Sequence, residues 1–254
     1  MNSSLEKIWL LDIGNTRCKG TRLQVNGERG DVSAFAYRDG VDSERLLKTL
    51  GAANAGDIVW LASVAPSGYR DAIVAALVAQ GYIVNVVRTE SRCRRLRIAY
   101  PQPEHLGVDR FLSLLAASER NEGACLLVSV GSAVTIDLLA SDGQHLGGVI
   151  APSAEHQRDA LAKHFMQLDV IAGHATDFAD DTADAIASGA QGAVLGLIER
   201  SRHLAAVRLG VSPRVIVSGG GADALAPMLP FAVELAPWLV LDGLAIFALN
   251  QKVA

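Results

Sequence analysis

Residues 10–16, LLDIGNT, decide the fold, because a second segment at residues 127–133, LVSVGSA, repeats their pattern. In both segments an apolar run ends at a glycine among small or polar residues, which is typical of a buried strand followed by a tight turn. Such a turn leaves backbone N–H groups free to hold an oxyanion. A strand-like run and a turn dipeptide follow each copy, Asn26-Gly27 in the first half and Asp142-Gly143 in the second. We therefore predict two related lobes whose loops face each other across a cleft.

The bulk composition excludes several classes of protein. The chain has 254 residues, half of them hydrophobic, so it can build a substantial core as one domain or two. Its 27 acidic and 23 basic residues argue against a dedicated nucleic-acid binder. Three scattered cysteines without a CxxC pair, Cys18, Cys93 and Cys125, fit a reducing cytoplasm better than a zinc site. Because there is no signal-peptide pattern and no apolar run of ~20 residues, we expect a cytoplasmic protein without a membrane segment.

Apolar stretches of strand length alternate with stretches of helical spacing along the chain. The expected strands are residues 8–13, 19–24, 58–64, 82–87, 124–130, 135–139, 146–150 and 215–217. The expected helices are residues 69–80, 109–119, 155–165, 182–203, 222–229 and 241–249. This alternation predicts an α/β fold, and the doubled loop predicts two lobes of one topology. The expected boundary gives an N-terminal lobe of residues 1–118 and a C-terminal lobe of residues 119–254.

Asp12 stands at the end of the first expected strand and is the strongest candidate for a metal ligand. A carboxylate at this place can hold a magnesium ion that bridges phosphates, or it can simply cap the turn. The adjoining Gly14-Asn15-Thr16 favours the ligand role. Lys19 follows three residues beyond the loop, and its side chain either reaches a phosphate or points to solvent.

The second loop carries Ser129 at the position of the first loop's carboxylate. Gly131-Ser132-Ala133 can still bind an anion through backbone N–H groups, and Thr135 adds a hydroxyl. Asp137 follows on the same strand face, either as a supporting acid near a ligand or as a packed structural residue. Gly219-Gly220-Gly221, after a short strand, permits a close approach of backbone to a ligand and fits an adenosine pocket.

Residues 107–110, GVDR, form the sharpest local constellation. Asp109 begins an expected helix, where aspartate is commonly an N-cap, but it can also act as a general base toward a substrate hydroxyl. Arg110 beside it can grip an anionic group. Upstream, residues 88–97 hold five arginines, which form either a solvated edge or a surface that attracts an anionic ligand.

Taken in order, these motifs resemble those of the type III pantothenate kinases, a branch of the acetate and sugar kinase/Hsp70/actin superfamily. The resemblance spans most of the chain, and it is the ordered set rather than any single motif that is specific. The matching motifs are Asp12-x-Gly14-Asn15-Thr16 with Lys19, Tyr100-Pro101 with Gly107-x-Asp109-Arg110, Gly131-Ser132-Ala133-x-Thr135-x-Asp137, Gly147-Gly148-x-Ile150-x-Pro152, Asp181-Thr182 with Ala185-Ile186 and Gly189, Gly219-Gly220, and Asp242-Gly243-Leu244.

The resemblance implies a homodimer of chains with two ribonuclease H-like lobes, the actin-like ATPase fold, around a central cleft. It implies transfer of the ATP γ-phosphoryl group to the primary hydroxyl of pantothenate, which gives 4'-phosphopantothenate in the first step of coenzyme A biosynthesis. Asp109 would be the general base, and the residues implied to bind pantothenate are Tyr100, Gly107, Val108, Asp109, Arg110 and, from the dimer partner, Thr182. The residues implied to bind ATP are Asp12, Gly14, Asn15, Thr16, Lys19, Gly131, Ser132, Ala133, Thr135, Gly219 and Gly220. Asp12 would hold Mg²⁺, and a monovalent cation, K⁺ or NH₄⁺, would lie near Ser129.

Four places depart from the pattern of this family. Ser129 replaces an aspartate that many members carry, Ser132 replaces a threonine, and Ser153 replaces the glycine of a Pro-Gly pair. The usual Thr-Ala pair is missing around Phe165. These departures concern the cation site and part of the substrate pocket.

Two rival interpretations follow from the departures and from the generality of the phosphate loops. One is a non-catalytic accessory or regulatory relative that keeps the kinase fold. The other is a superfamily kinase for another small alcohol. Retention of Asp12, Asp109 and Arg110 favours a catalyst, and residues 100–110 favour pantothenate.

Overall fold

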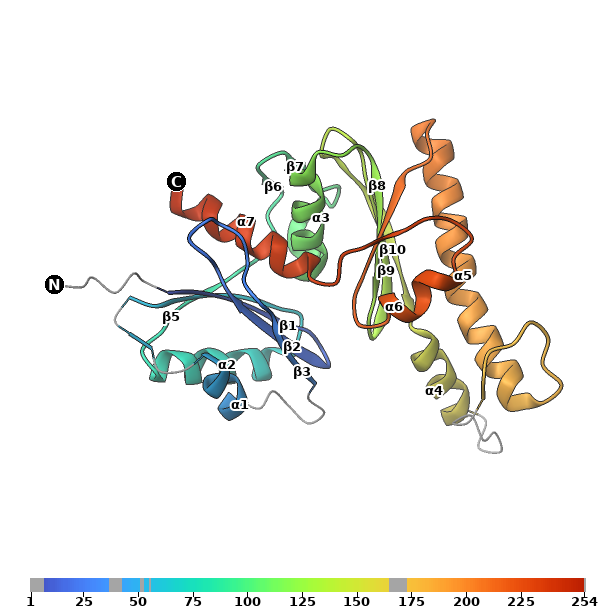
Figure 1. The fold of residues 1–254 in the computed structure, drawn as a ribbon, viewed down its shortest axis with the longest axis horizontal. Coiled ribbons are helices and arrows are strands. Elements are labelled where there is room, and N and C mark those ends of the chain that lie inside the picture. The colour runs from blue at the N-terminus through green and yellow to red at the C-terminus, as the bar shows by residue number, and fades with distance from the viewer. Residues whose placement is uncertain (1–6, 37–42, 51–52, 55, 165–172, 254) are drawn as a thin grey trace. The chain divides into compact units, whose positions relative to one another are not determined.

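The computed structural model describes residues 7–36, 43–50, 53–54, 56–164 and 173–253. The chain divides into two compact units, Met1–Arg120 with Trp238–Ala254, and Asn121–Pro237, and each contains one five-stranded sheet (Figure 1). From the sequence we expected the end of the chain to belong to the C-terminal lobe. In the structure, the contacts of residues 238–254 group them with the first unit. None of the described helices is both long and apolar enough to cross a bilayer.

The sheet of the first unit is built around a hairpin and two parallel neighbours. Its strand order is β3-β2-β1-β4-β5, with β1 antiparallel to β2 and parallel to β4. The strands are β1 Ile8–Ile13, β2 Arg17–Arg22, β3 Ser33–Ala36, β4 Ile58–Ser63 and β5 Ile83–Val86. The register places Asp12 opposite Lys19, so the predicted metal ligand and the predicted phosphate contact lie on neighbouring strands.

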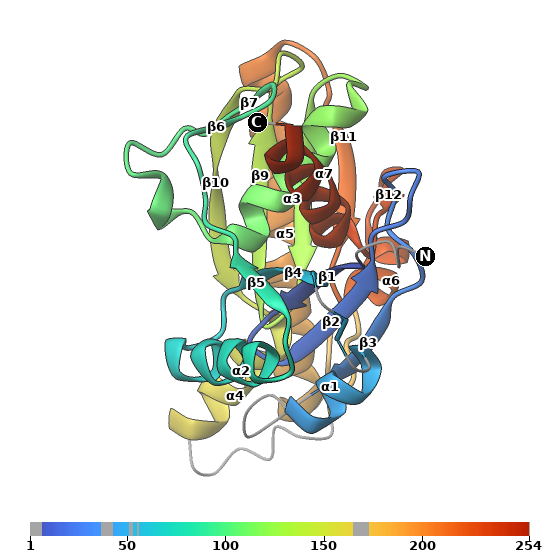
Figure 2. The same ribbon diagram turned by 90° about the vertical axis from the view of Figure 1, so that its left-hand side faces the viewer.

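Helices cover both faces of this sheet. Helices α1, Ser43–Leu50, and α2, Ser67–Ala79, bury their apolar residues against one face in a core that includes Leu11 and Ile13 of β1. Helix α7, Leu239–Val253, packs on β1 and β4 from the other side, and α3, Val108–Arg120, packs on α7 (Figure 2). Because side chains alternate along a strand, Asp12 faces the α3 and α7 side.

The arginine-rich segment forms a small hairpin in the first unit. Strands β6, Arg92–Cys93, and β7, Leu96–Arg97, pair antiparallel around Arg94, which has a positive φ of 51°. The side chain of Arg94 forms an ion pair with Glu119 of α3 at 3.0 Å. The run is thus partly neutralised by its own unit. A short 3₁₀ turn, Pro103–His105, then leads to α3.

The second unit repeats the strand arrangement of the first. Its order is β10-β9-β8-β11-β12, so β8 corresponds to β1 and carries the second loop at its end. The strands are β8 Cys125–Val130, β9 Ala133–Leu139, β10 His145–Pro152, β11 Arg214–Ser218 and β12 Glu234–Leu235. The helices are α4 Ala154–His164, α5 Thr182–Leu209, α6 Ala222–Leu225 and the 3₁₀ turn Ala226–Met228. The predicted pair of related α/β lobes is therefore confirmed.

The long helix α5 covers one face of this second sheet. Asp181 caps its first turn by accepting a hydrogen bond from the Asp184 N–H at 2.9 Å, and Gly210 ends it in the left-handed conformation with φ of 70°. The helix therefore runs further than the predicted residue 203. Its apolar side packs on Leu126, Val128 and other residues of the sheet.

Candidate active site

Asp12 is a buried carboxylate whose neighbours are charged. It is 6 % exposed, and Lys19 Nζ donates to Asp12 Oδ2 at 3.4 Å. Burial raises the pKa of Asp12, Lys19 lowers it, and the nearby charge of Asp109 raises it further. Lys19 therefore does not point to solvent, because its charge partly compensates the buried carboxylate.

A backbone hydrogen bond closes each of the two glycine loops. The Gly14 N–H donates to the Arg17 carbonyl at 2.9 Å, and the Gly131 N–H donates to the Ala133 carbonyl at 3.0 Å. These two amides therefore close hairpin turns, which is a correction to the view that the glycine N–H groups lie open for an anion. The side chains of Asn15 and Thr16 in the first loop are exposed at the end of the strand.

Asp109 lies in the first turn of α3, and its carboxylate occupies space that a glycine leaves open. A β-carbon on Gly107 would lie 2.7 Å from Asp109 Oδ1, so a larger residue there would push the carboxylate aside. Asp109 Oδ1 accepts a hydrogen bond from the Arg110 N–H at 2.8 Å. Helix α3 begins at Val108, so Asp109 lies inside the first turn of the helix. It is therefore not the N-cap that its position in the sequence suggested. The side chain remains partly exposed, as a base requires.

Arg110 and Tyr100 form one structural pair. The Arg110 side chain is largely buried, with the residue 6 % exposed, and its Nη1 donates to Tyr100 Oη at 3.2 Å. Its guanidinium also lies 5.8 Å from the centre of the Tyr100 ring. These contacts fix the orientation of a cation beside Asp109. The predicted substrate residues 100–110 and Asp12 thus belong to one unit of the structure.

The glycine turn after β11 packs against the end of β8 in the second unit. Gly219 has a φ of 92°, and a β-carbon there would lie 2.3 Å from the Val130 carbonyl oxygen. The Gly221 N–H donates to the same oxygen at 3.0 Å. Gly220, between them, is exposed. The glycines therefore bring this turn next to the second loop, where the predicted ATP residues Ser132 and Ala133 lie.

Three predicted residues share the face of the second sheet that is turned away from α5. Ser129 pairs with Thr135 in the register of β8 and β9, and Asp137 follows two residues later. Asp137 is buried, and its Oδ1 lies 3.0 Å from His145 Nε2. This buried pair supports the structural role for Asp137.

The serine at position 153, where the family pattern has glycine, has a local structural explanation. Its Oγ accepts a hydrogen bond from the His156 N–H at 3.2 Å and lies 2.9 Å from His156 Nδ1. A hydroxyl immediately before α4 satisfies an N–H group of the first turn, which glycine could not do. The departure around Phe165 lies outside the described residues.

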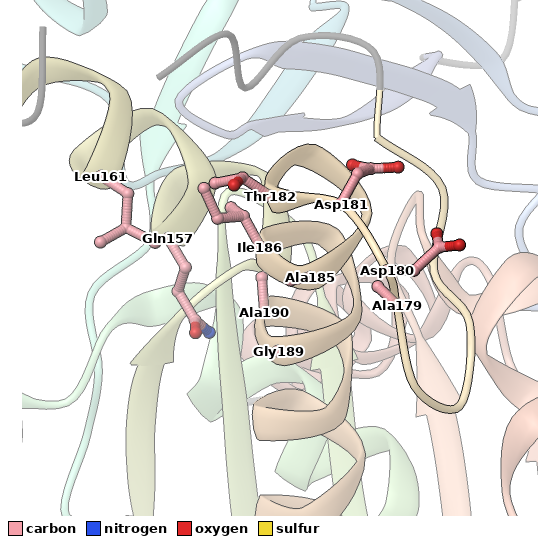
Figure 3. Close-up of a pocket in the computed structure, with 10 residues that line it drawn as sticks. All are labelled: Gln157, Leu161, Ala179, Asp180, Asp181, Thr182, Ala185, Ile186, Gly189 and Ala190. Atoms are coloured by element: carbon pink, nitrogen blue, oxygen red, sulfur yellow. The ribbon is translucent and has the colours of Figure 1, made fainter. Parts of the chain in front are cut away.

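Thr182 begins α5 beside an open cavity of about 610 Å³ in the second unit. Figure 3 shows Thr182 facing α4, which contributes Gln157 and Leu161, whereas Asp180 lies on the preceding loop at the other side of α5. The exposed part of α5 beyond it is lined with small residues. A β-carbon on Gly189, for example, would meet no atom within 4 Å.

The first unit offers two carboxylates to a cation. Within the described ranges no cluster of three or more His, Cys, Asp or Glu side chains is arranged as a metal cage. Asp12, with Asp109 close enough to influence its pKa, fits a divalent ion that takes one or two carboxylates and completes its shell with water and phosphate.

The sequence did not predict the ion pairs of Asp242. Asp242 in the first turn of α7 bonds the Arg29 guanidinium at 2.5 Å and lies 3.9 Å from Arg120. It joins the hairpin after β2 to the end of α3. The Asp-Gly pair inside an apolar helical run was the available signal, since glycine is unfavourable in a helix unless packing requires it.

The fold is that of the actin-like ATPases and sugar kinases. An activator of 2-hydroxyisocaproyl-CoA dehydratase from Clostridium difficile with bound ADPNP matches with a TM-score of 0.56 and 16% identity, covering 97% of this chain and 96% of that one. MreB 5 of Spiroplasma citri bound to AMPPNP matches with a TM-score of 0.51 and 14% identity, covering 98% of both chains. At these identities the likeness concerns the fold alone.

The family follows from closer relatives. The family model described as type III pantothenate kinase matches residues 8–203. A type III pantothenate kinase of Stenotrophomonas maltophilia strain K279a is 46% identical over 245 residues, covering 96% of this chain and 98% of the relative. One from Xanthomonas campestris pv. campestris strain B100 is 45% identical with the same coverage. The chain belongs to the type III pantothenate kinase family.

Proposed function

We propose that the protein phosphorylates pantothenate with ATP to give 4'-phosphopantothenate, the first step of coenzyme A biosynthesis. Family membership over nearly the whole chain supports this activity. The observation that carries the mechanism is that Asp12, Asp109 and the Arg110–Tyr100 pair are held by neighbouring elements of one unit. A non-catalytic relative would have no physical reason to keep both the buried carboxylate of Asp12 and the buried guanidinium of Arg110, because both are costly to desolvate.

Asp109 is the proposed general base. Its carboxylate takes the proton of the primary hydroxyl of pantothenate as the hydroxyl oxygen bonds to the γ-phosphorus of ATP. The bond between that phosphorus and the β,γ-bridging oxygen breaks, and ADP leaves with the bond's electron pair. Gly107 leaves the carboxylate its space, and the hydrogen bond from the Arg110 N–H to Oδ1 fixes the orientation of the carboxylate.

Arg110 is the proposed clamp for the anionic end of pantothenate. Guanidinium binds carboxylate in a planar, bidentate geometry, and burial strengthens the pair. Tyr100 restricts the guanidinium from one side by its hydroxyl and its ring. Val108 and Gly107 complete the proposed pantothenate segment at the start of α3.

Phosphate contacts for ATP are proposed in each glycine loop separately. In the first, Asn15, Thr16 and Lys19 are proposed phosphate contacts; in the second, Ser132 and Thr135 are. The family and the fold imply ATP with a divalent metal, and we assign Mg²⁺ to Asp12. When bound, Mg²⁺ neutralises charge that develops on the phosphoryl oxygens.

A monovalent cation, K⁺ or NH₄⁺, is proposed near Ser129. Ser129 and Thr135 offer neutral oxygens on the same face of the sheet, which suit a weakly held monovalent ion. The test is turnover in K⁺, NH₄⁺ and Na⁺ at equal ionic strength. Equal rates in all three would remove this cation from the proposal.

A homodimer is proposed to complete the pantothenate site through Thr182. The supporting observation is the exposed glycine face of α5, where β-carbons on Gly189, Gly192 or Gly196 would meet no atom within 4 Å. Small residues let two helices approach closely. Gly192→Arg should give a monomer by light scattering coupled to size exclusion, with pantothenate turnover lost; a Gly192→Arg dimer would contradict this interface.

The decisive experiment is an ADP-release assay with ATP, Mg²⁺ and pantothenate. Pantothenate-dependent ADP release, with 4'-phosphopantothenate detected by mass spectrometry, supports the kinase. Background ADP release from a folded protein that binds ATP would favour a non-catalytic relative. Release that depends on another small alcohol instead of pantothenate would favour a different superfamily kinase.

A further inference from the structure

The second unit contains a cavity that none of the proposed steps uses. It has a volume of about 350 Å³ and lies between the last turns of α5 and the sheet face beneath them. Leu126, Leu138 and Ala205 form an apolar floor, and Leu146 lines one side. The volume is at the lower end of the range of about 300–1,000 Å³ that is typical of small-molecule sites.

A bulge in the backbone of β10 leaves room at one side of this cavity. The pairing of β10 with β9 shifts register between His145 and Gly148, and Gly147 within the shift has a φ of 105°. A β-carbon on Gly147 would meet no atom within 4 Å, so this bulge leaves space.

The rim of the cavity is positively charged. Arg200 and Arg208 of α5 line it with exposed side chains, and none of the described residues that line it is acidic. Arg208 Nη1 donates to the Leu146 carbonyl at 3.1 Å, which holds this guanidinium at the mouth with its other N–H groups still available. An apolar floor below two guanidinium groups matches a molecule with an apolar chain and one anionic head.

We propose that this cavity is a second binding site for a small amphipathic anion, an alkyl or acyl chain that ends in a carboxylate or a phosphate. The chain would bury its carbon atoms on the leucine floor, and the head would bind Arg200 and Arg208.

This site is distinct from the phosphate loop of the same unit. Leu126, on the cavity floor, precedes Val130 at the loop by four residues of β8, which is ~13 Å along a strand. A ligand in the cavity therefore does not overlap the second loop.

Calorimetric titration of the intact protein tests the proposal with three probes: octanoate, octyl phosphate and octanol. We expect at least one of the two anions to bind, and the preferred head identifies carboxylate or phosphate as the natural chemistry. Octanol should bind at least about tenfold more weakly, which is ~1.4 kcal/mol. Absence of binding by both anions, or equal binding by octanol, would overturn the site.

Substitutions of residues that line the cavity test whether the anion binds there. Arg200→Gln with Arg208→Gln should weaken the bound anion about tenfold or more, and Ala205→Leu should weaken it by filling the floor. Arg202→Gln is the control, because it removes one positive charge from the same helix at a residue that does not line the cavity. Turnover of pantothenate should persist in all of these variants and reports that they are folded. An anion that binds the double variant as tightly as the wild type would contradict the assignment.

Discussion

Gly243 of α7 packs directly on Leu112 of α3: a β-carbon on Gly243 would lie 1.9 Å from the Leu112 carbonyl oxygen. Leu112 is one turn after Asp109, so the last helix supports the helix that carries the proposed base. Phe247 of α7 adds an edge contact to Phe111, with ring centres 6.0 Å apart. The position of the base thus depends on a backbone contact made far away in the sequence.

Gly243→Ala should therefore destabilise the protein by about 1–3 kcal/mol, since an overpacked contact with backbone forces the two helices apart. The measurement is the free energy of unfolding by urea denaturation. Gly68→Ala in α2 is the matched control, because its added β-carbon meets no atom within 4 Å. A Gly243→Ala protein as stable as the Gly68→Ala control would contradict this packing.

Asp109→Asn should lower turnover by about 10²–10⁴, the usual contribution of a general base, because the amide cannot take the hydroxyl proton. ATP binding and the free energy of unfolding should change little. Asp71→Asn, at an exposed residue of α2, is the control for the loss of one negative charge. Turnover near the wild-type value in Asp109→Asn would remove this residue as the base.

Arg110→Gln should raise the KM for pantothenate by about 10–100-fold, because the proposed charge-assisted hydrogen bond to the substrate would be lost. Tyr100→Phe keeps the guanidinium and removes only its acceptor at Oη, so a smaller rise of about 2–10-fold is expected. The KM for ATP should stay constant in both. Steady-state kinetics with each substrate varied separately checks this order, and a rise in the ATP value alone would place Arg110 at the nucleotide instead.

Asp57 should make stability depend on pH in the acid range. Asp57 is only 1 % exposed, and burial alone would raise the pKa of its carboxyl group. Hydrogen bonds from the backbone N–H groups of Asn54 and Lys7, each at 2.9 Å, outweigh this effect and bring the pKa below its usual 3.8. A group whose pKa is lowered on folding stabilises the protein above the unfolded value and loses that contribution as pH falls through the folded one.

Asp57→Asn should accordingly be less stable by about 1–3 kcal/mol at pH 7. Its deficit relative to the wild type should shrink as the pH falls below about 4, where the wild-type carboxylate takes up a proton. Urea denaturation at a series of pH values gives both curves. A deficit that stays constant down to pH 2 would show that the Asp57 charge has no part in stability.

Most of the fold could be predicted from the sequence because its strands are apolar runs bounded by turns. The strand at residues 8–13 has those bounds in the structure, and the expected pairing of two loops with two sheets is present. Short or polar elements gave no such signal: β12 is only two residues long, and the hairpin around Arg94 is rich in charge. Their pairing comes from the neighbouring strand and not from local preference.

The candidate site was predictable where residues adjoin in sequence and less so where they meet in space. The 107–110 segment could be recognised directly, whereas the Lys19 to Asp12 contact depends on the register of a hairpin. The grouping of α7 with the first unit comes from its packing on α3, β1 and β4, and these long-range contacts leave no periodic pattern in the sequence. The buried Asp137–His145 pair likewise required the structure.

The first unit is made of two separate segments of the chain, so it cannot be completed until the end of the chain has been synthesised. Residues 239–253 leave the ribosome only after the whole of residues 121–237, yet they cover β1 and β4. Until then the sheet that holds Asp12 has an apolar face without its partner helix. A chaperone that shields nascent apolar surface would protect this face, and a stalled ribosome would expose it.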